Sequence, residues 1–333
     1  MSRLIRIIGV GVLAALGSLT LSADEDLSRP QWWPSPWGAE DQLGAANRLG
    51  PDKVLQAAKL ITEGAVFDMG RVFEDDMPLF TLTPHHREYA LFTPGAPMYG
   101  PLGGNGLFWN EDYISGHLGQ DGTQFDALAH MGTARGATSD LNNVRYYNGF
   151  SHADIGSAHG FSKLGVEQVP PIFTPGILLD IRGLKGRRLE RSEEITVADL
   201  KAALKRQGLS ETDIHPGDAI FYNTGWGEWW KVDNAKFNSG TPGLSVEAGD
   251  WLVDKKVVLV GSDNWAVEAI PHPNPELFAP NHQKFLVENG IYIMENLDFS
   301  TLIKASVWRF AFSFSPIPFR GATGSPARPF AIR

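Results

Sequence analysis

The chain has 333 residues, of which 43% are hydrophobic and 20% charged, so it is long enough and apolar enough to bury a substantial core. Its formal net charge of −9 argues against a nucleic-acid surface, which would need clustered Lys and Arg. Because the chain has no cysteine, thiol catalysis, thiolate metal sites and disulfides are excluded, and any metal must be held by His, Asp, Glu, Gln or water.

The first 23 residues have the layout of a secretory signal peptide. Arg3 and Arg6 precede an uncharged apolar run from Ile7 to Leu21, which is short for a membrane span. Leu21 fits the usual small-residue rule for cleavage after Ala23 imperfectly, so an uncleaved N-terminal anchor is the alternative. We expect residues 1–23 to be removed, which leaves a periplasmic or secreted protein, residues 24–333, with no membrane span.

The mature chain is predicted to begin with an extended arm and to continue as alternating helices and strands. Residues 24–50 are rich in Trp, Pro and Gly, which indicates an arm that packs through its aromatic side chains. Residues 74–110 are predicted to be a long loop that shapes a pocket. Helices are predicted at 51–60, 196–205, 245–253 and 281–287, and strands at 65–72, 177–181, 219–223, 257–261 and 291–294. This alternation, with no linker between two folding units, predicts a single α/β domain.

The segment Gln-Asp-Gly-Thr-Gln-Phe-Asp-Ala-Leu-Ala-His, from Gln120 to His130, places polar groups where they can meet. Gln124 and Asp126 face the same way on an extended segment, and Asp126 and His130 share a face on a helical turn. A turn at Asp121-Gly122 can fold Gln120 back toward Gln124. Aspartate is an anionic oxygen ligand and histidine a ligand or proton carrier. Taken alone, the spacing also occurs in ordinary turns and helix caps.

A second pair of polar residues lies far along the chain. His282 falls on a predicted helix, where it is equally consistent with a surface position. Glu295 follows the predicted strand 291–294, and a carboxylate at the end of a buried strand needs a metal or a cation as its partner.

These residues resemble the cyclase family of metal-dependent hydrolases, the group that includes bacterial kynurenine formamidase and isatin hydrolase. Gly122, Thr123, Asp126 and His130 match the family motif His-x-Gly-Thr-His-x-Asp-x-x-x-His, whereas Gln120 and Gln124 replace its two metal-binding histidines. The later His and Glu ligands of the family match His282 and Glu295. Further similar stretches follow in family order at 37–49, 223–226, 242–245, 261–263 and 323–328.

The resemblance implies a swivelling β/β/α-type domain with a mixed sheet, assembled as a homodimer or homotetramer. It implies one divalent metal, Mn²⁺ or Zn²⁺, that activates water to hydrolyse an amide, formamide, cyclic amide or lactone bond in a small molecule, as an arylformamidase does. By the same resemblance, the metal ligands are Asp126, His282 and Glu295 together with Gln124 and Gln120. His130 is then the general acid and base.

The two glutamines change what the metal site is expected to bind. Glutamine is a neutral oxygen donor and a weaker zinc ligand than imidazole, so the substitutions favour manganese or another single ion and argue against a two-metal site. His117 or Asp121 can stand in for Gln120 as the completing ligand.

Four aromatic residues are candidates to line a pocket for a flat aromatic or cyclic substrate, although each is also consistent with core packing: Trp109, Phe125, Trp226 and Trp265. Glu268 and His272 follow the strand that ends at Asp263 and are further candidates to reach the site.

Two alternatives to a hydrolase are a non-catalytic periplasmic binding protein with a degenerate metal site and a lyase or cyclisation enzyme that uses the same site. The presence of Asp126, His130, His282 and Glu295 together favours the enzyme, because a pure binding protein does not need these four polar groups around one point.

Overall fold

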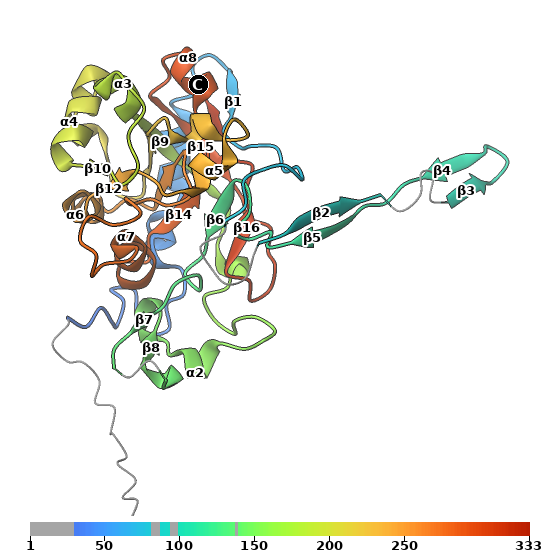
Figure 1. Ribbon diagram of the computed structural model, residues 1–333, viewed down its shortest axis with the longest axis horizontal. Helices are drawn as coiled ribbons and strands as arrows, with labels where there is room; N and C mark the ends of the chain where they lie inside the picture. The colour runs from blue at the N-terminus through green and yellow to red at the C-terminus, as the bar shows by residue number, and fades with distance from the viewer. Residues whose placement is uncertain (1–29, 81–86, 94–98, 137–138) are drawn as a thin grey trace, which may run out of the picture.

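The computed structural model describes residues 30–80, 87–93, 99–136 and 139–333 (Figure 1). The predicted signal peptide, residues 1–23, lies outside the described residues. In the described ranges, helices are too short or too polar to span a bilayer.

One mixed sheet organises the domain. Within the described residues it has nine strands, in the order β1-β17-β15-β9-β11-β13-β14-β6-β16. The central strands β9, β11, β13 and β14 are parallel, and the neighbours on both sides are antiparallel. The strands of this sheet are β1 (Val66–Asp68), β6 (Gln124–Asp126), β9 (Ile172–Asp180), β11 (Ala219–Asn223), β13 (Leu259–Ser262), β14 (Tyr292–Glu295), β15 (Arg309–Phe314), β16 (Gly324–Pro326) and β17 (Phe330–Ile332).

Four short antiparallel or parallel ladders lie outside this sheet in the described residues. They pair β2 (Tyr89–Phe92) with β5 (Tyr113–Gly116), β3 (Tyr99–Leu102) with β4 (Leu107–Trp109), β7 (Thr133–Ala134) with β8 (Val144–Arg145), and β10 (Glu194–Ile195) with β12 (Gly243–Leu244).

The helices are short. They are α1 (Pro51–Ala58), α2 (His152–Ile155), α3 (Ile181–Lys185), α4 (Val197–Arg206), α5 (Asn234–Asn238), α6 (Val246–Asp254), α7 (Pro280–His282) and α8 (Ser300–Lys304). Single 3₁₀ turns occur at Gly44–Arg48, Leu141–Asn143, Tyr147–Gly149, Val166–Gln168, Glu211–Asp213 and Trp226–Trp229. A π-helical turn, Gln283–Glu288, continues α7.

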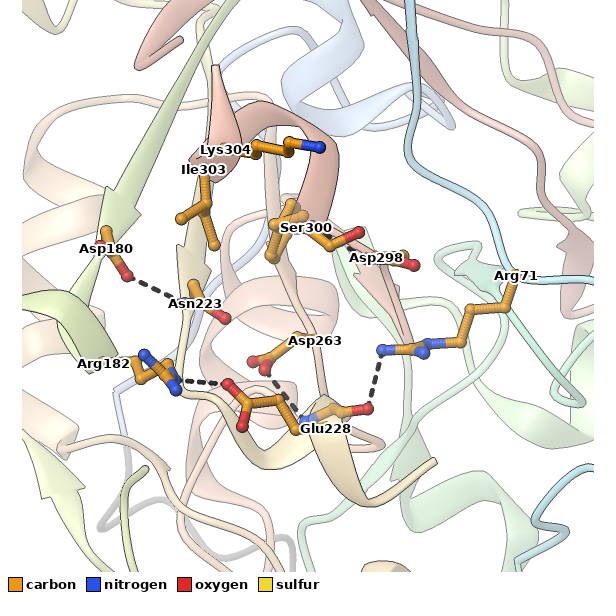
Figure 2. A pocket seen from close by; sticks show the side chains of 12 residues that line it. Arg71, Asp180, Arg182, Asn223, Glu228, Asp263, Asp298, Ser300, Ile303 and Lys304 are labelled. Atoms are coloured by element: carbon orange, nitrogen blue, oxygen red, sulfur yellow. Dashed lines mark hydrogen bonds and ion pairs between the residues drawn. The ribbon is translucent and has the colours of Figure 1, made fainter. Parts of the chain in front are cut away.

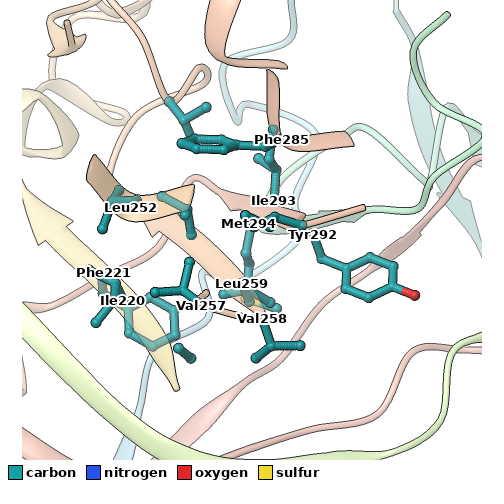
Figure 3. Packing of buried hydrophobic residues seen from close by; sticks show 14 of the residues in the cluster. Ile220, Phe221, Leu252, Val257, Val258, Leu259, Phe285, Tyr292, Ile293 and Met294 are labelled. Carbon is teal, nitrogen blue, oxygen red and sulfur yellow. The ribbon is translucent and has the colours of Figure 1, made fainter. Parts of the chain in front are cut away.

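The central parallel strands β11, β13 and β14 are buried along their whole length and are mainly apolar up to a polar residue at the carboxyl end of each, because both of their faces are covered. Figure 3 shows Phe221 of β11, Leu259 of β13 and Ile293 of β14 packed with Leu252 of α6 and Phe285. Helix α1 packs against β9 and β15, and α4 packs against α3, α6 and β9. This packing fixes the carboxyl ends of the parallel strands, where polar residues follow.

The alternating elements predicted from the sequence are confirmed within a few residues. Strand β11 has the predicted bounds, and β9 begins earlier than predicted. Thr196 and Asp199 form the capping box of α4. The N-terminal arm is also confirmed in its described part, where Trp32 donates a hydrogen bond to the Tyr146 carbonyl.

The prediction of a loop over 74–110 is wrong in its second half. The described residues from Tyr89 to Gly116 form two successive antiparallel ladders, which project from the body as a narrow ribbon (Figure 1). Proline and glycine are frequent in this stretch, and these residues usually indicate loops. Here they sit within and between strands that pair only with each other.

Candidate metal centre

The sheet brings the two halves of the predicted site together. Strand β6 lies antiparallel to β14, with Gln124 opposite Glu295 and Asp126 opposite Ile293. Strand alternation places Gln124 and Asp126 on one face and Phe125 on the other. His130 follows β6 after a short turn, and His282 ends α7. The pairing of β6 with β14 therefore brings Gln124 and Asp126 to Glu295, and α7 adds His282.

Four side chains face each other at close range. His130 Nε2 lies 3.9 Å from Asp126 Oδ1, and His282 Nε2 lies 3.9 Å from Asp126 Oδ2. His282 Nε2 also lies 3.3 Å from Glu295 Oε1. One ligand atom each of Asp126, His130 and His282 can be chosen so that all lie within 4.8 Å of one another. The arrangement has the size of a single-ion site.

Buried oxygen atoms without hydrogen-bond partners show that this cluster suits a cation. Both carboxylate oxygens of Asp126, Oε1 of Glu295 and Oε1 of Gln124 are buried and accept no hydrogen bond. Leaving a buried carboxylate oxygen unpaired is costly. A divalent ion among them would satisfy all four, and a donor set dominated by oxygen suits a hard ion such as Mn²⁺ better than Zn²⁺.

Glu268 orients His282. Its Oε1 lies 2.5 Å from His282 Nδ1, and its Oε2 accepts a hydrogen bond from the His282 backbone N–H at 3.0 Å. A carboxylate at Nδ1 assigns the ring proton to that nitrogen and leaves the Nε2 lone pair directed at Asp126 and Glu295. Glu268 itself is fully buried. The sequence marked it only as a further candidate, and His272, named with it, instead contacts Asn274.

The electrostatics of the cluster reflect its acidity. Burial raises the pKa of Glu295 to about 8, and Asp126 and Glu268 nearby add to the rise. Burial alone lowers the pKa of His282, but Glu268 and Glu295 raise it well above its ordinary value. Burial lowers the pKa of His130. The site therefore favours added positive charge, whether as protons or as a cation, while His130 is held neutral.

The two glutamines occupy different positions. Gln124 Nε2 donates to Glu295 Oε2 at 2.9 Å, which directs its own Oε1 away from that carboxylate as a free oxygen donor. Gln120 lies behind His130, with its Nε2 3.4 Å from His130 Nδ1 and 3.3 Å from Thr323 Oγ1. Gln124 is thus placed like a ligand, whereas the Gln120 side chain contacts the far nitrogen of His130.

His117 and Asp121 lie to the side of the cluster. His117 Nδ1 accepts a hydrogen bond from the Glu88 backbone, and Asp121 accepts one from the His117 backbone at 3.0 Å. Burial raises the pKa of Asp121 to about 6. Neither belongs to the group of close metal-binding atoms found among the described residues.

A cavity of about 290 Å³ opens onto the cluster. Its polar lining includes Gln124, His130, His282 and Glu295, and its apolar lining includes Phe80, Met131, Trp265, Ile270 and Phe278. Trp265 and Phe80 meet edge to face with ring centroids 5.0 Å apart. Arg87 also lines the cavity and donates a hydrogen bond to the Gln120 carbonyl. No sequence pattern indicated Arg87, because it lies in a stretch without a recognisable motif.

Three of the four predicted pocket aromatics lie elsewhere. Phe125 points into the core, where it stacks on Tyr292 with centroids 5.1 Å apart. Trp226 is buried beside Trp230 and Phe237 and donates to the Phe237 carbonyl. Trp109 lies on β4 of the ribbon, 39% exposed. Of this set, Trp265 is the residue that lines the cavity.

A second cavity, of about 480 Å³, lies beyond the carboxyl ends of β9, β11 and β13 (Figure 2). Its charged groups other than Lys304 pair with one another, with Asn223 or with the backbone. Asp180 accepts from Asn223, Arg182 contacts Glu228, and Asp263 accepts from the Gly227 N–H. Asp263 also accepts from the backbone and hydroxyl of Thr224, which holds the turn after β11. These groups stabilise the fold around the turn.

Comparisons with known proteins agree with this geometry. Residues 57–269 match a family model described as a putative cyclase. Among solved structures, the chain is similar to one described as a novel cyclase, with 30% identity and a TM-score of 0.76 over 89% of this chain and 98% of that one. It is also similar to isatin hydrolase A from Ralstonia solanacearum, with 20% identity and a TM-score of 0.58 over 81% and 92% of the two chains.

A third similar structure is an isatin hydrolase bound to the product analogue thioisatinate, with 20% identity and a TM-score of 0.59 over 85% of this chain and 98% of that one. At this identity the isatin hydrolases show a shared fold. A search of curated proteins gave no match.

Proposed function

Because the chain belongs to the cyclase family, we propose that it is a metal-dependent hydrolase that cleaves an amide, formamide, cyclic amide or lactone bond. The observation that carries this proposal is the set of buried oxygens of Asp126, Glu295 and Gln124 that lack hydrogen-bond partners, gathered around the Nε2 of His282. A folded protein keeps such a set at a cost unless it holds a cation.

The proposed ligands of one divalent ion are Asp126, His282, Glu295 and Gln124, with Mn²⁺ favoured over Zn²⁺. When bound, the ion supplies Lewis acidity, which polarises a carbonyl and lowers the pKa of water. Glu268 keeps His282 in the tautomer that can bind the ion. Gln120, predicted as a ligand, is proposed instead to contact His130.

His130 is proposed as the general acid and base. Proton transfer to and from the cavity needs a lone pair on Nε2, so we place the ring proton on Nδ1 and assign the end of the Gln120 amide that lies 3.4 Å from Nδ1 as its oxygen, which accepts that proton in a hydrogen bond. Nε2 faces Asp126 and the cavity. In this form neutral His130 can accept a proton from the attacking water at Nε2, and the imidazolium so formed can give that proton to the leaving nitrogen or oxygen.

The substrate is proposed to be a small aromatic or cyclic compound. The cavity is lined by Trp265 and Phe80 on one side and by the polar cluster on the other, which suits a flat ring with an attached carbonyl group. Isatin, named in two similar structures, is a compound of this kind. Export to the periplasm or beyond, as expected from residues 1–23, and assembly as a homodimer or homotetramer complete the proposal.

The decisive test is the metal content of the purified mature protein, measured by elemental mass spectrometry after incubation with Mn²⁺ or Zn²⁺. We expect about one equivalent in the wild type and almost none in Asp126→Ala. His130→Ala is the matched variant: it should keep the metal while kcat on a responsive formamide, cyclic amide or lactone falls by ~10²–10⁴-fold.

The other outcomes point to different functions. A wild type that takes up no divalent ion would refute the hydrolase and favour a binding protein. Loss of the metal in His130→Ala would make His130 a ligand. Products that incorporate no oxygen from isotope-labelled water would favour a lyase or a cyclisation reaction at the same site.

A further inference from the structure

The ribbon, comprising described residues 87–93 and 99–117, exposes an unusual number of large apolar side chains. It leaves the body near β6 and β16 and projects away from it (Figure 1). Its apolar side chains are between 39% and 61% exposed, namely Leu91, Phe92, Leu102, Leu107, Phe108, Trp109, Tyr113 and Ile114. The described part of the molecule thus leaves a substantial fraction of each of these side chains exposed.

An exposed apolar ribbon of this kind requires a partner surface. Neighbouring residues on a strand point to opposite faces, so Leu91 and Phe92 of β2, and Phe108 and Trp109 of β4, expose apolar groups on both faces. A two-stranded ribbon without a packed face is at best marginally stable in water. Contiguous apolar surface on a soluble protein marks a site of interaction.

The charges of the ribbon limit the kinds of partner. Arg87, at the start of the ribbon, lines the cavity at the metal centre. Between residues 88 and 116 the acidic side chains are Glu88, Glu111 and Asp112, and this span has no Lys or Arg. Nucleic acids and anionic membranes attract basic segments, so both are disfavoured. The ribbon instead fits a surface that is apolar and flanked by cations.

The body carries such a surface, here called the acceptor face and defined as Val72, Ile317, Phe319, Arg320 and Arg328. Val72 is 72%, Ile317 46% and Phe319 42% exposed. Val72, Ile317 and Arg328 line a groove of about 540 Å³. Arg328 pairs with Asp68, which also lines the groove. The apolar side chains of the acceptor face complement the apolar ribbon, and Arg320 complements its acidic residues.

The acceptor face adjoins the base of the ribbon on the same molecule. His117 and Gly119, where the ribbon returns to the body, line a shallow hollow together with Phe319. Phe73, in the wall of the groove, packs on Tyr89 at the start of β2 with ring centroids 6.0 Å apart. A donor and an acceptor surface that lie side by side form one self-complementary patch, which a two-fold axis can pair with its own copy.

We propose that the ribbon of one copy lies on the acceptor face of a second copy, and that the exchange is mutual in a two-fold dimer. The exposed area supports this partner. Large apolar and aromatic side chains of which about half is exposed give roughly 800 Å² per ribbon, the contribution of one partner to a standard interface. Two ribbons and two acceptor faces bury roughly 3,000 Å², which is within the range of obligate homodimers.

The exchange adds a structural cause to the homo-oligomer proposed above, and it does not depend on the metal or the reaction. Sedimentation velocity of the mature protein across a concentration series tests it. We expect the wild type to be a dimer. The ribbon variant Leu91→Ser/Phe108→Ser/Ile114→Ser should dimerise at least ~100-fold more weakly, because several buried apolar anchors are lost together.

The acceptor variant Val72→Glu/Phe319→Glu should be a monomer for the same reason. The matched control Val54→Ser/Leu55→Ser changes apolar residues that are 44% and 60% exposed on α1, and it should remain a dimer. Mixing the ribbon and acceptor variants should restore a heterodimer, because one intact ribbon still meets one intact acceptor face. This restoration also shows that both variants are folded.

Three results would overturn the exchange. They are a wild type that stays monomeric at every concentration, a ribbon variant that dimerises like the wild type, and a mixture that gives no heterodimer. A monomer that binds phosphatidylserine vesicles through the ribbon would identify a membrane partner instead. Metal content measured on the same samples reports separately on the proposed function, since a mutual dimer without metal would refute only the hydrolase.

Discussion

At the scale of single residues, Glu268 controls how His282 can act. The carboxylate holds both the ring Nδ1 and the backbone N–H of His282. Glu268 is itself fixed, because Leu244 pairs with it in a parallel bridge and Val267 next to it accepts from the Tyr222 hydroxyl at 2.6 Å. The imidazole is therefore pre-oriented before any ligand arrives.

Replacement of Glu268 should weaken metal binding without removing a ligand. In Glu268→Ala, His282 loses its orienting partner, and we expect the metal dissociation constant to rise by ~10–100-fold. Glu268→Gln keeps an acceptor for Nδ1–H and should recover part of that loss. Competition titration with a chromophoric chelator measures both constants. Equal metal affinity in the wild type and Glu268→Ala would show that the contact only supports the fold.

Some site residues could be predicted from the sequence and others could not. Four predicted site residues do lie together, namely Asp126, His130, His282 and Glu295. They could be predicted because a sequence motif indicated the first three and the end of a buried strand indicated Glu295. The aromatic predictions failed where a strand turned Phe125 to the other face. Glu268 and Arg87 reach the site through loops whose path only the folded chain defines, so local pattern gave little or no signal for them.

At the scale of elements, a buried ion pair attaches α1 to the sheet. Lys53 Nζ lies 2.5 Å from Asp218 Oδ1, with side chains 7% and 0% exposed. Asp218 precedes β11, and its other oxygen accepts from the His215 backbone at 2.8 Å. The pair therefore fixes the helix against the amino end of a central strand, opposite the end that leads to the metal centre.

Removal of the lysine should be strongly destabilising. Lys53→Met leaves the Asp218 carboxylate buried without its cation, which costs about 3–5 kcal/mol of unfolding free energy. Urea denaturation followed by tryptophan fluorescence measures the loss. Lys59→Met, on the exposed residue after α1, should change stability by less than about 0.5 kcal/mol. A Lys53→Met protein as stable as the wild type would mean that the pair contributes nothing to stability.

Helices and strands could be predicted where the hydrophobic periodicity agrees with capping or turn residues at their ends. Helix α4 has a capping box and an amphipathic face, and β11 and β13 are short apolar runs that end in polar turns. The ribbon lacks both signals. Its strands do not alternate polar with apolar residues, and glycine and proline interrupt them. The usual periodic signal of a strand with one buried face is therefore missing.

At the scale of the whole molecule, an acidic protein buries several carboxylates at one point. The chain has a net charge of −9, and Asp126, Glu268 and Glu295 lie together in its interior. Arg87, which lines the cavity at the metal centre, balances part of this charge, and protonation of His282 can balance a further part. Charge balance in the interior therefore depends on protons unless a divalent ion takes their place.

Metal removal should make the stability of the whole protein depend on pH. The pKa of Glu295 rises on folding from its ordinary value of 4.5 to about 8, and that of His282 also rises. A group whose pKa rises on folding stabilises the protein at low pH, and this stability is lost as pH increases through the folded pKa. The loss begins above the unfolded pKa, 4.5 for Glu295 and 6.5 for His282, so the metal-free protein should lose stability between about pH 5 and 9.

A bound divalent ion replaces the protons, so the metal-loaded protein should stay nearly constant over the same pH interval. Differential scanning fluorimetry of chelator-treated and metal-loaded samples measures the two melting temperatures. We expect their difference to widen by several degrees toward pH 9. In Glu295→Gln, which cannot titrate at that position, the melting temperature of the metal-free protein should depend less on pH. If the melting temperatures of the chelator-treated and metal-loaded wild type change with pH in the same way, the buried acids of this cluster do not hold a metal.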